Sequence, residues 1–315
     1  MGRSALGERN ANDGMAAQAI SSAWRRYAPP RVVLLLPAQL TLLVVVVAPS
    51  LILVFLSLTD WQLTQGVPWF RADMVWFWNF YDLYFDERFL HAVVLTVAFV
   101  AVCVTVELVL AVGLALLFLE EWRWRKAALA LLVLPMMIVP VDAANAFFML
   151  FNERGPINYL IELMVGHTFD FAWLGDPRTA VLPIALAEIW QWTPLMFLLV
   201  LSGLLNSPRN QHRAAIALGA SPTRAFLSVL LPLALPVISI AMLIRAIETF
   251  KVFDSVYILT RGGPGSVTET ISMFMFNGAF VYFRMGYIAA AALLVLILVA
   301  GLCMGLLGPL QRNSR

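Results

Sequence analysis

Two long stretches of this chain, Val32–Thr59 and Met285–Pro309, contain no charged residue. Each is longer than the roughly 20 apolar residues that an α-helix needs to cross the hydrocarbon core of a bilayer. Over all 315 residues, 61% are hydrophobic and 13% are charged, whereas an average soluble domain has about 25% charged residues. No single soluble core could hold so many apolar side chains. The chain is therefore expected to fold in a membrane.

Four further apolar runs lie between these two, and they hold the ionisable residues Glu107, Asp142, Glu188 and Arg245. We predict an all-α polytopic membrane protein with six transmembrane helices in one membrane domain. The predicted spans are residues 32–59, 89–119, 127–151, 179–205, 225–250 and 285–309, within a domain of residues 31–310, with a loop at 206–224 and tails at 1–30 and 311–315. The first run is too long for the apolar region of a signal peptide, about 7–15 residues, so we expect a retained anchor.

The distribution of lysine and arginine predicts the orientation of the spans. If both termini are cytoplasmic, the internal segments hold 13 of these residues and the external segments hold 7, which with Arg245 make up the chain's 21. Internal loops of membrane proteins carry the excess of positive charge. The N-terminus, the C-terminus and the loop at 206–224 are therefore predicted to be cytoplasmic.

Several function classes are excluded by composition. The two lysines follow Arg125 and Phe250, so neither can complete a GxxxxGK[ST] phosphate loop. Two cysteines and three histidines lie far apart, without an HExxH pattern, and predict neither a disulfide framework nor a metal site. A net charge of +2 without basic clusters gives no reason to expect nucleic acid. We expect no catalytic residues, no metal and no cofactor in this chain.

The loop at 206–224 has the composition of two short helices joined by a turn. Residues Arg209–Leu218 favour a helix, and Gly219 suits its C-terminal cap because glycine adopts the left-handed conformation freely. Ser221 and Pro222 then form a typical start, in which the hydroxyl caps free amides and proline occupies the first turn. We therefore predict a helical elbow at the cytoplasmic face.

The residues of this elbow resemble the EAA loop of ABC-importer permeases. In that family the pattern is approximately EAA, three residues, GA, then F and LP. Here it is matched by Ala214-Ala215, Gly219-Ala220, Phe226 and Leu231-Pro232. Four further motifs follow the family's order: GPIN at 155–158, WLGDP at 173–177, EIWQWTP at 188–194 and FKVFDSVYILTRGGPG at 250–265. Together they resemble the carbohydrate-uptake permeases of the maltose and glycerol-phosphate type, over residues 31–309.

The resemblance implies a type I ABC importer permease fold in the bacterial plasma (inner) membrane. It implies four kinds of partner: a second homologous permease, more often distinct than identical, two ATP-binding subunits that hold ATP and Mg²⁺, an extracytoplasmic solute-binding protein, and the lipid membrane. The residues that would couple to the ATPase are Arg213, Ala214, Ala215, Gly219, Ala220, Ser221, Pro222 and Phe226. The protein would do no chemistry itself and would transport a sugar, a polyol or a related solute.

Three positions depart from the family's pattern. Arg213 stands where the family has glutamate, Leu218 where an acidic residue is common, and Arg261 at the first position of a GGGPG-like turn. Either the cognate ATPase presents a surface that compensates for the lost carboxylate, or this subunit couples weakly while its partner carries the standard loop. We favour the first interpretation, because the rest of the elbow keeps the family's residue types.

Ionisable residues in a span are costly and are therefore candidate site residues. Arg245 and Glu248 are three residues apart and share a helix face. They either line the pathway and bind sugar hydroxyls, or form an ion pair with each other. The resemblance adds Thr249 and Val252 to this face. We expect Glu107 and Glu188 to face a partner or to be hydrogen-bonded between helices.

Two other pairs are candidates for the pathway. Trp190 and Trp192 could stack on the apolar faces of a sugar, or could pack against neighbouring helices. Asp142 and Asn145 are three residues apart in a span that prolines interrupt, and prolines in spans often border cavities.

The first external loop, residues 69–85, is crowded with aromatic residues. Such rings favour the membrane–water boundary, which indicates a short interfacial helix. The alternative is a docking surface for an external partner.

An ion-gradient-driven secondary transporter of small solutes is the alternative function. It would show internal inverted repeats with interrupted helices in corresponding halves, and we find no such repeat in the sequence.

Overall fold

The computed structural model describes residues 31–207 and 209–313, so the predicted N-terminal tail, residues 1–30, lies outside the described part. Within that part the regular structure is helical, apart from one isolated bridge between Thr59 and Met74. The chain divides into two compact units, Met1–Phe55 and Leu56–Arg315. The all-α fold predicted from the sequence is confirmed.

The described part of the first unit is a nearly continuous helix. It consists of α2 (Arg31–Leu42), a π-helical turn η1 (Leu43–Val47) and α3 (Ala48–Ser57), whose last residues enter the second unit. Its apolar side chains from Leu35 to Val54 are largely exposed. That exposure is expected of a helix whose neighbours are lipid chains or a partner protein rather than its own core.

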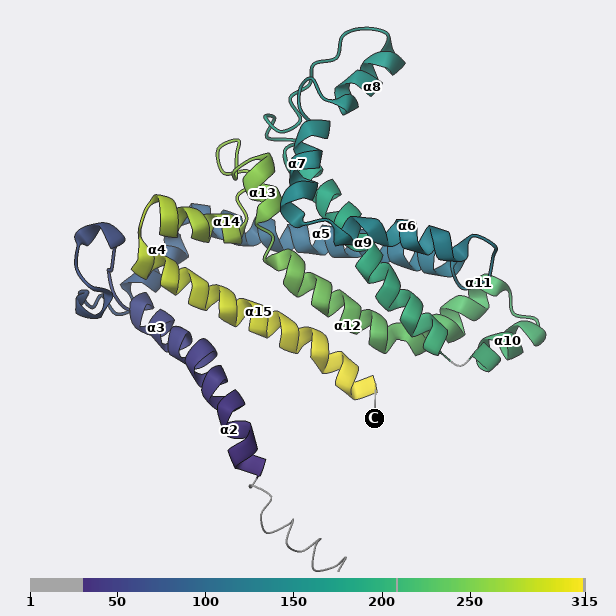
Figure 1. Cartoon of the computed structure of the whole chain (residues 1–315), viewed down its shortest axis with the longest axis horizontal. Coiled ribbons are helices and arrows are strands. Elements are labelled where there is room, and N and C mark those ends of the chain that lie inside the picture. The colour runs from purple at the N-terminus through teal and green to yellow at the C-terminus, as the bar shows by residue number, and fades with distance from the viewer. Residues whose placement is uncertain (1–30, 208, 314–315) are drawn as a thin grey trace, which may run out of the picture. The chain divides into compact units, whose positions relative to one another are not determined.

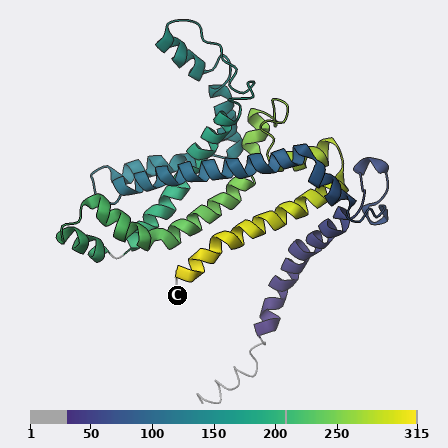
Figure 2. The ribbon, with the colours of Figure 1, turned by 180° about the vertical axis from the view of Figure 1, so that it is seen from behind.

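The second unit contains the remaining helices. In chain order they are η2 (Leu63–Gln65), η3 (Trp69–Arg71), α4 (Trp78–Phe85), α5 (Glu87–Leu117), α6 (Arg125–Met137), α7 (Pro140–Leu150), α8 (Pro156–Val165), α9 (Val181–Asn206), α10 (Arg209–Ala217), α11 (Pro222–Ala225), η4 (Phe226–Leu230), α12 (Leu231–Phe250), α13 (Asp254–Leu259), α14 (Ile271–Phe276), η5 (Asn277–Val281) and α15 (Met285–Asn313). Helices α5, α12 and α15 run side by side (Figures 1 and 2). Because α15 continues to Asn313, residues 311–313 of the predicted C-terminal tail are helical.

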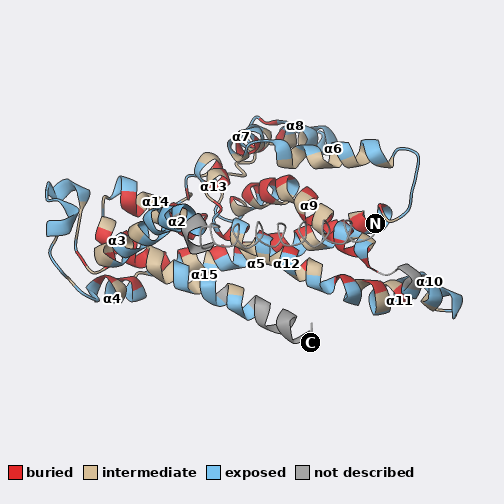
Figure 3. Cartoon of the chain, turned by 60° about the horizontal axis from the view of Figure 1, so that its bottom comes forward, coloured by how far each residue is buried: buried red, intermediate tan, exposed pale blue. Residues whose placement is uncertain are grey.

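The main core lies where α5, α9 and α12 meet. Large buried side chains such as Phe197 alternate there with the small residues Ala111, Ala234 and Ala241, which let the helices approach closely. At Gly203 a methyl group would lie only 3.0 Å from the Cβ of Val237. Buried residues are dense along α9 (Figure 3), whereas α6 buries none completely. Helix α9 is thus the central element of the described bundle.

The predicted span at 127–151 is not one straight helix. It is split into α6 and α7, whose axes differ by 93°. Pro140 begins α7, and the residue before a proline is driven towards extended backbone, which ends α6. The side-chain amide of Gln191 donates to the carbonyl of Ile138 at 2.8 Å and so pairs a carbonyl that the break frees. Counting this bent pair as one span gives six candidate spans in the described residues, and five without it.

The aromatic loop contains a short helix, α4, in front of α5. The amide of Asn79 donates to the carbonyls of Ser57 and Thr59, each at 2.9 Å, and anchors the buried face. The opposite face exposes a set of mutually contacting rings: Trp78, Tyr81, Tyr84 and Phe85. The short helix is therefore present, and an interfacial role and a docking role would both use this same exposed face.

Gly286 gives a test of how tightly α15 packs at its start. A methyl group there would lie 2.0 Å from the carbonyl oxygen of Thr59, and the Gly286 amide donates to Trp61 at 2.9 Å. Gly286→Ala should therefore lower the stability of the purified protein by about 1–3 kcal/mol or more, as overpacking does. Thermal unfolding in detergent measures the loss.

Gly301→Ala is the matched control, because Gly301 is in the same helix and has nothing within 4 Å of the added methyl group. It should leave the melting temperature unchanged or raise it, since alanine is the better helix former by about 0.5–1 kcal/mol. Equal melting temperatures for the two variants would contradict the packing described here.

Candidate functional site

One fully buried arginine joins the three central helices. Arg245 of α12 donates from Nε and from Nη2 to the two carboxylate oxygens of Glu107 on α5, both at 2.8 Å. Its Nη2 also donates to Glu188 on α9 at 3.0 Å. A bidentate arginine–carboxylate pair is among the strongest hydrogen-bonded contacts in proteins. The expectation that Glu107 and Glu188 are hydrogen-bonded between helices is confirmed.

Two further contacts complete the surroundings of the guanidinium group. Nη2 donates to the hydroxyl of Thr249 at 2.8 Å, and the ring of Trp192 lies 5.0 Å from Cζ, within cation–π distance. Nη1 is buried and has no hydrogen-bond partner within the described residues. Two carboxylates thus share one guanidinium group, whose Nη1 is a donor without a partner among the described residues.

The alternative of an ion pair between Arg245 and Glu248 is wrong. Glu248 pairs instead with Lys251 at 3.0 Å, and both of these side chains are exposed. Arg245 points into the core, where two buried carboxylates outcompete a solvated one because burial strengthens their attraction for the guanidinium group.

A polar cavity of about 260 Å³ lies beside the buried cluster. Its lining residues come from α7, α9, α12 and the segment that follows α12: Pro140, Glu188, Trp192, Arg245, Glu248, Lys251, Val252, Phe253, Asp254 and Ser255. Typical small-molecule pockets measure about 300–1,000 Å³ and combine apolar walls with a few polar groups. The cavity has this mixed character and nearly this size.

The structure brings together part of the predicted pathway set. The cavity is lined by four of them, Arg245, Glu248, Val252 and Trp192. Thr249 does not line it but accepts a hydrogen bond from Arg245.

Three predicted pathway residues lie elsewhere. Trp190 packs on Phe147 with ring centroids 5.6 Å apart, as the packing alternative predicts. Asp142 and Asn145 are exposed on α7, and Asn145 donates to the carbonyl of Val141 at 3.0 Å.

Sequence reasoning missed several lining residues. Lys251, Phe253, Asp254 and Ser255 belong to the motif at 250–265, but they were not assigned to the pathway. The signal was present, because the helix-face argument for Arg245 and Glu248 points to the same end of α12. The short break between α12 and α13 is what turns these residues towards the cavity.

The elbow has the local structure that its residues predict. Gly219 has a φ of +92°, and the amides of Gly219 and Ala220 donate to the carbonyls of Ile216 and Ala215 at 2.9 and 3.0 Å. This pair of bonds is a Schellman cap. The hydroxyl of Ser221 then accepts from the amide of Arg224 at 3.3 Å, with Pro222 at the first helical position.

The surface of the elbow is open to a partner. Leu218 is 89% exposed at its tip, and a methyl group on Gly219 would meet nothing within 4 Å. Ala225 behind it is buried, and Phe226 is partly buried. Ala214, Ser221 and Pro222 are exposed, and Ala215 and Ala220 are partly exposed. The side chain of Arg213 is outside the described atoms.

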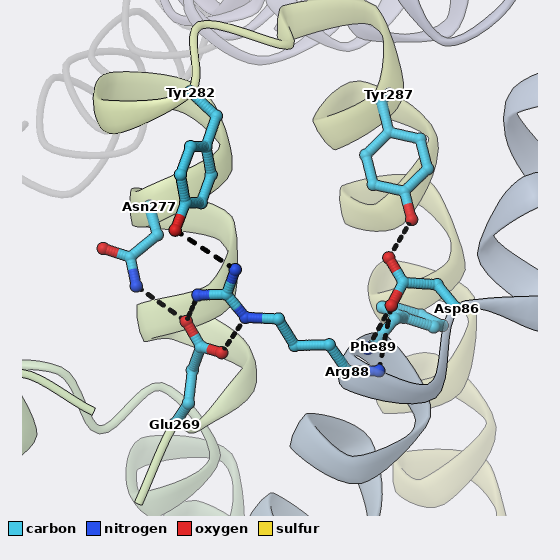
Figure 4. Close-up of polar contacts among 7 residues, drawn as sticks. All are labelled: Asp86, Arg88, Phe89, Glu269, Asn277, Tyr282 and Tyr287. Carbon is cyan, nitrogen blue, oxygen red and sulfur yellow. Dashed lines mark hydrogen bonds and ion pairs between the residues drawn. The ribbon is translucent and has the colours of Figure 1, made fainter. Parts of the chain in front are cut away.

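A second polar network joins the beginning of α5 to the segment before α14, to η5 and to α15 (Figure 4). The guanidinium group of Arg88 forms a bidentate ion pair with Glu269, whose Oε1 also accepts from the amide of Asn277 at 2.6 Å. Asp86 caps α5 by accepting from the amides of Arg88 and Phe89, and it also accepts from the hydroxyl of Tyr287. This network holds the end of the bundle that lies opposite the elbow in Figure 1.

Comparison with protein families gives a match over nearly the whole described chain. Residues 31–313 match the family described as "Binding-protein-dependent transport system inner membrane component". Among curated relatives, the sulfoquinovosyl glycerol transport system permease protein SmoG of Agrobacterium fabrum is 31% identical over 275 residues, 86% of each chain. The trehalose/maltose transport system permease protein MalF of Thermococcus litoralis is 30% identical over 209 residues, 66% of this chain and 69% of that protein.

Solved structures share the fold. A bacterial ABC transporter involved in the import of the acidic polysaccharide alginate contains a chain that superposes with a TM-score of 0.78 at 18% identity, covering 96% of this chain and 100% of that one. The type I importer architecture predicted from the sequence is therefore confirmed.

The two carboxylates of the buried cluster should differ in their contribution to stability. Glu107→Gln breaks the bidentate pair and should cost roughly 3–5 kcal/mol, as the loss of one partner of a buried ion pair does. Either variant leaves one carboxylate for the guanidinium group, but Glu188→Gln keeps both bonds to Glu107 and loses only the charge behind a single contact, so stability should change little. Thermal unfolding of both purified variants measures the difference, and an equal loss in both would contradict the larger role assigned to the bidentate pair.

Proposed function

The chain belongs to the family of binding-protein-dependent transport system inner membrane components, and we propose that it forms one half of the translocation pathway of an ATP-driven carbohydrate importer. The single observation that carries this proposal is the match to the family over residues 31–313. The names of two relatives, which specify trehalose/maltose and sulfoquinovosyl glycerol, favour a sugar or a sugar derivative as the solute.

The polar cavity is the part of the pathway that this chain supplies. Trp192 offers an aromatic face to apolar C–H groups, while Glu248 and Lys251 offer exposed polar groups to hydroxyls. A wall with a few oriented polar groups on an apolar background suits a sugar. The homologous second permease would complete the wall of this cavity, whose volume within this chain is about 260 Å³.

The elbow is the coupling element. Its first helix, α10, would dock in a groove of an ATP-binding subunit through Ala214, Ala215 and the exposed tip around Gly219 and Leu218. The small residues keep this surface shallow, so a partner helix or groove can approach the backbone closely.

A continuous helical path leads from the elbow to the cavity. Helices α11, η4 and α12 follow one another without a gap from Pro222 to Phe250. Arg245 lies 23 residues beyond Pro222, a distance of roughly 35 Å along a helix. Displacement of the elbow would therefore move the arginine that joins α5, α9 and α12, and with it one wall of the cavity.

The proposed setting is the bacterial plasma membrane, with both termini and the elbow cytoplasmic. The lysine and arginine count supports this orientation, and the loop between α5 and α6 lies at the same end of the second unit as the elbow (Figure 1). Two ATP-binding subunits would bind ATP and Mg²⁺, and an external solute-binding protein would deliver the sugar. The ion-gradient-driven alternative gains no support from the family match.

Gly219 tests the coupling role. Gly219→Val forces a β-branched residue into a φ of +92°, which strains the cap and displaces the tip of the elbow. The ATP-binding subunit should then no longer co-purify, and ATP-dependent uptake into proteoliposomes should be lost.

Gly66→Val is the control for backbone strain. Gly66 also has positive φ, +66°, and open space around it, but it lies in the loop before α4. Uptake should persist in this variant. Normal co-purification and uptake with Gly219→Val, or robust uptake by this chain without any ATPase, would contradict the proposal.

Arg213 separates the two interpretations of the altered EAA pattern. If the cognate ATPase compensates for the lost carboxylate, Arg213→Glu places like charges or an unpaired carboxylate at the interface, and uptake should fall several-fold. Arg224→Glu makes the same charge change on the exposed second helix of the elbow and should have a smaller effect. Unchanged uptake with Arg213→Glu would favour weak coupling by this subunit, with the partner permease carrying the standard loop.

A further inference from the structure

The charges around the polar cavity are not balanced. Three carboxylates line it, those of Glu188, Glu248 and Asp254, against two cations, Arg245 and Lys251. Glu107 adds a fourth carboxylate directly behind Arg245. Carboxylates therefore outnumber cations by four to two around the cavity, a formal charge of −2.

Both cations are already paired with carboxylates of this chain. Arg245 already holds both oxygens of Glu107 at 2.8 Å and one of Glu188 at 3.0 Å. Lys251 is paired with Glu248 at 3.0 Å. A solute carboxylate or phosphate would have to displace one of these partners, and it would still experience the remaining negative charge. Repulsion between like charges is strong where the effective dielectric is low.

The polar groups suit hydroxyl and amino groups. The exposed ammonium group of Lys251 has more than one donor and can also donate to a hydroxyl oxygen. The carboxylates of Glu248 and Asp254 can accept from a hydroxyl or from an ammonium group. A neutral sugar satisfies both kinds of group, because each of its hydroxyls can donate and accept.

We propose that the cavity selects neutral or amino-bearing sugars and polyols and disfavours anionic solutes such as uronates and sugar phosphates. This inference rests on the proposed function, in which the cavity is part of the solute pathway. It assigns the side chains of Glu188, Glu248 and Asp254 a role in solute choice through their charge. It also separates the solutes named for two relatives, because trehalose and maltose are neutral, whereas sulfoquinovosyl glycerol carries a sulfonate group and is anionic, as glycerol phosphates and uronates are.

The test compares probes that share a carbon skeleton and differ in charge. Binding of glucose, glucosamine and glucuronate, and of glycerol and glycerol 3-phosphate, is measured by titration calorimetry on the detergent-purified importer, with both permeases and both ATP-binding subunits. Glucuronate should bind at least about tenfold more weakly than glucose, and glycerol 3-phosphate more weakly than glycerol. Glucosamine should bind at least as tightly as glucose.

Two variants of this chain should shift the discrimination in opposite directions. Glu248→Gln removes a negative charge and should narrow the ratio between glucose and glucuronate, whereas Lys251→Gln removes a positive charge and should widen it. If Glu248 and Lys251 only supported the fold, the two variants would not shift this ratio in opposite directions. Asp73→Asn, an exposed carboxylate outside the cavity, is the control and should leave the ratio unchanged.

The outcomes distinguish failure of the charge selection from failure of the proposed function. If glucuronate binds as tightly as glucose, or if the two variants shift the ratio in the same direction, the charge selection is overturned while the importer assignment stands. If the complete importer takes up neither the neutral probes nor trehalose nor maltose, the carbohydrate assignment itself fails, and the inference fails with it.

Discussion

Arg245 cannot leave its position without exposing two buried carboxylates to an apolar core. That constraint fixes the relation of α5, α9 and α12, because each contributes one charged member of the cluster. Well-packed apolar residues could hold three helices together equally firmly. The ionic cluster also fixes the rotation of α12 about its axis, because the edge of the planar guanidinium group must face Glu107. With this rotation, Glu248 and Val252 face the cavity.

Local features of the molecule could be predicted from the sequence, and the elbow is the clearest example. A glycine with positive φ, a serine cap and a proline at the first helical position are decided by residues within a few positions of one another. The partners of Arg245 are 138 and 57 residues away. The sequence identifies all three charges as costly in a membrane, but only the packing of the helices determines which of them meet.

Two physical reasons explain why Trp190, Asp142 and Asn145 lie away from the cavity. Trp190 and Trp192 are two positions apart, which is about 200° around a helix, so both cannot face one cavity; the sequence cannot say which one does. The run at 127–151 is apolar except for Asp142 and Asn145, so its composition predicts one span. The 93° bend depends on Pro140 and on Gln191, from another helix, which binds the carbonyl of Ile138.

The π-helical turn η4, between the elbow and α12, has a consequence for the length of the chain. A π-helical turn contains one more residue than an α-helical turn, while the helices on its two sides keep the phase of an uninterrupted helix. Loss of one residue within Phe226–Leu230 would therefore leave the orientation of the elbow relative to Arg245 nearly unchanged. Loss of one residue within α12, between this turn and Arg245, would rotate the elbow by about 100°. Relatives of this protein can thus differ in length at this turn and still keep the orientation of the elbow relative to the residue at the position of Arg245.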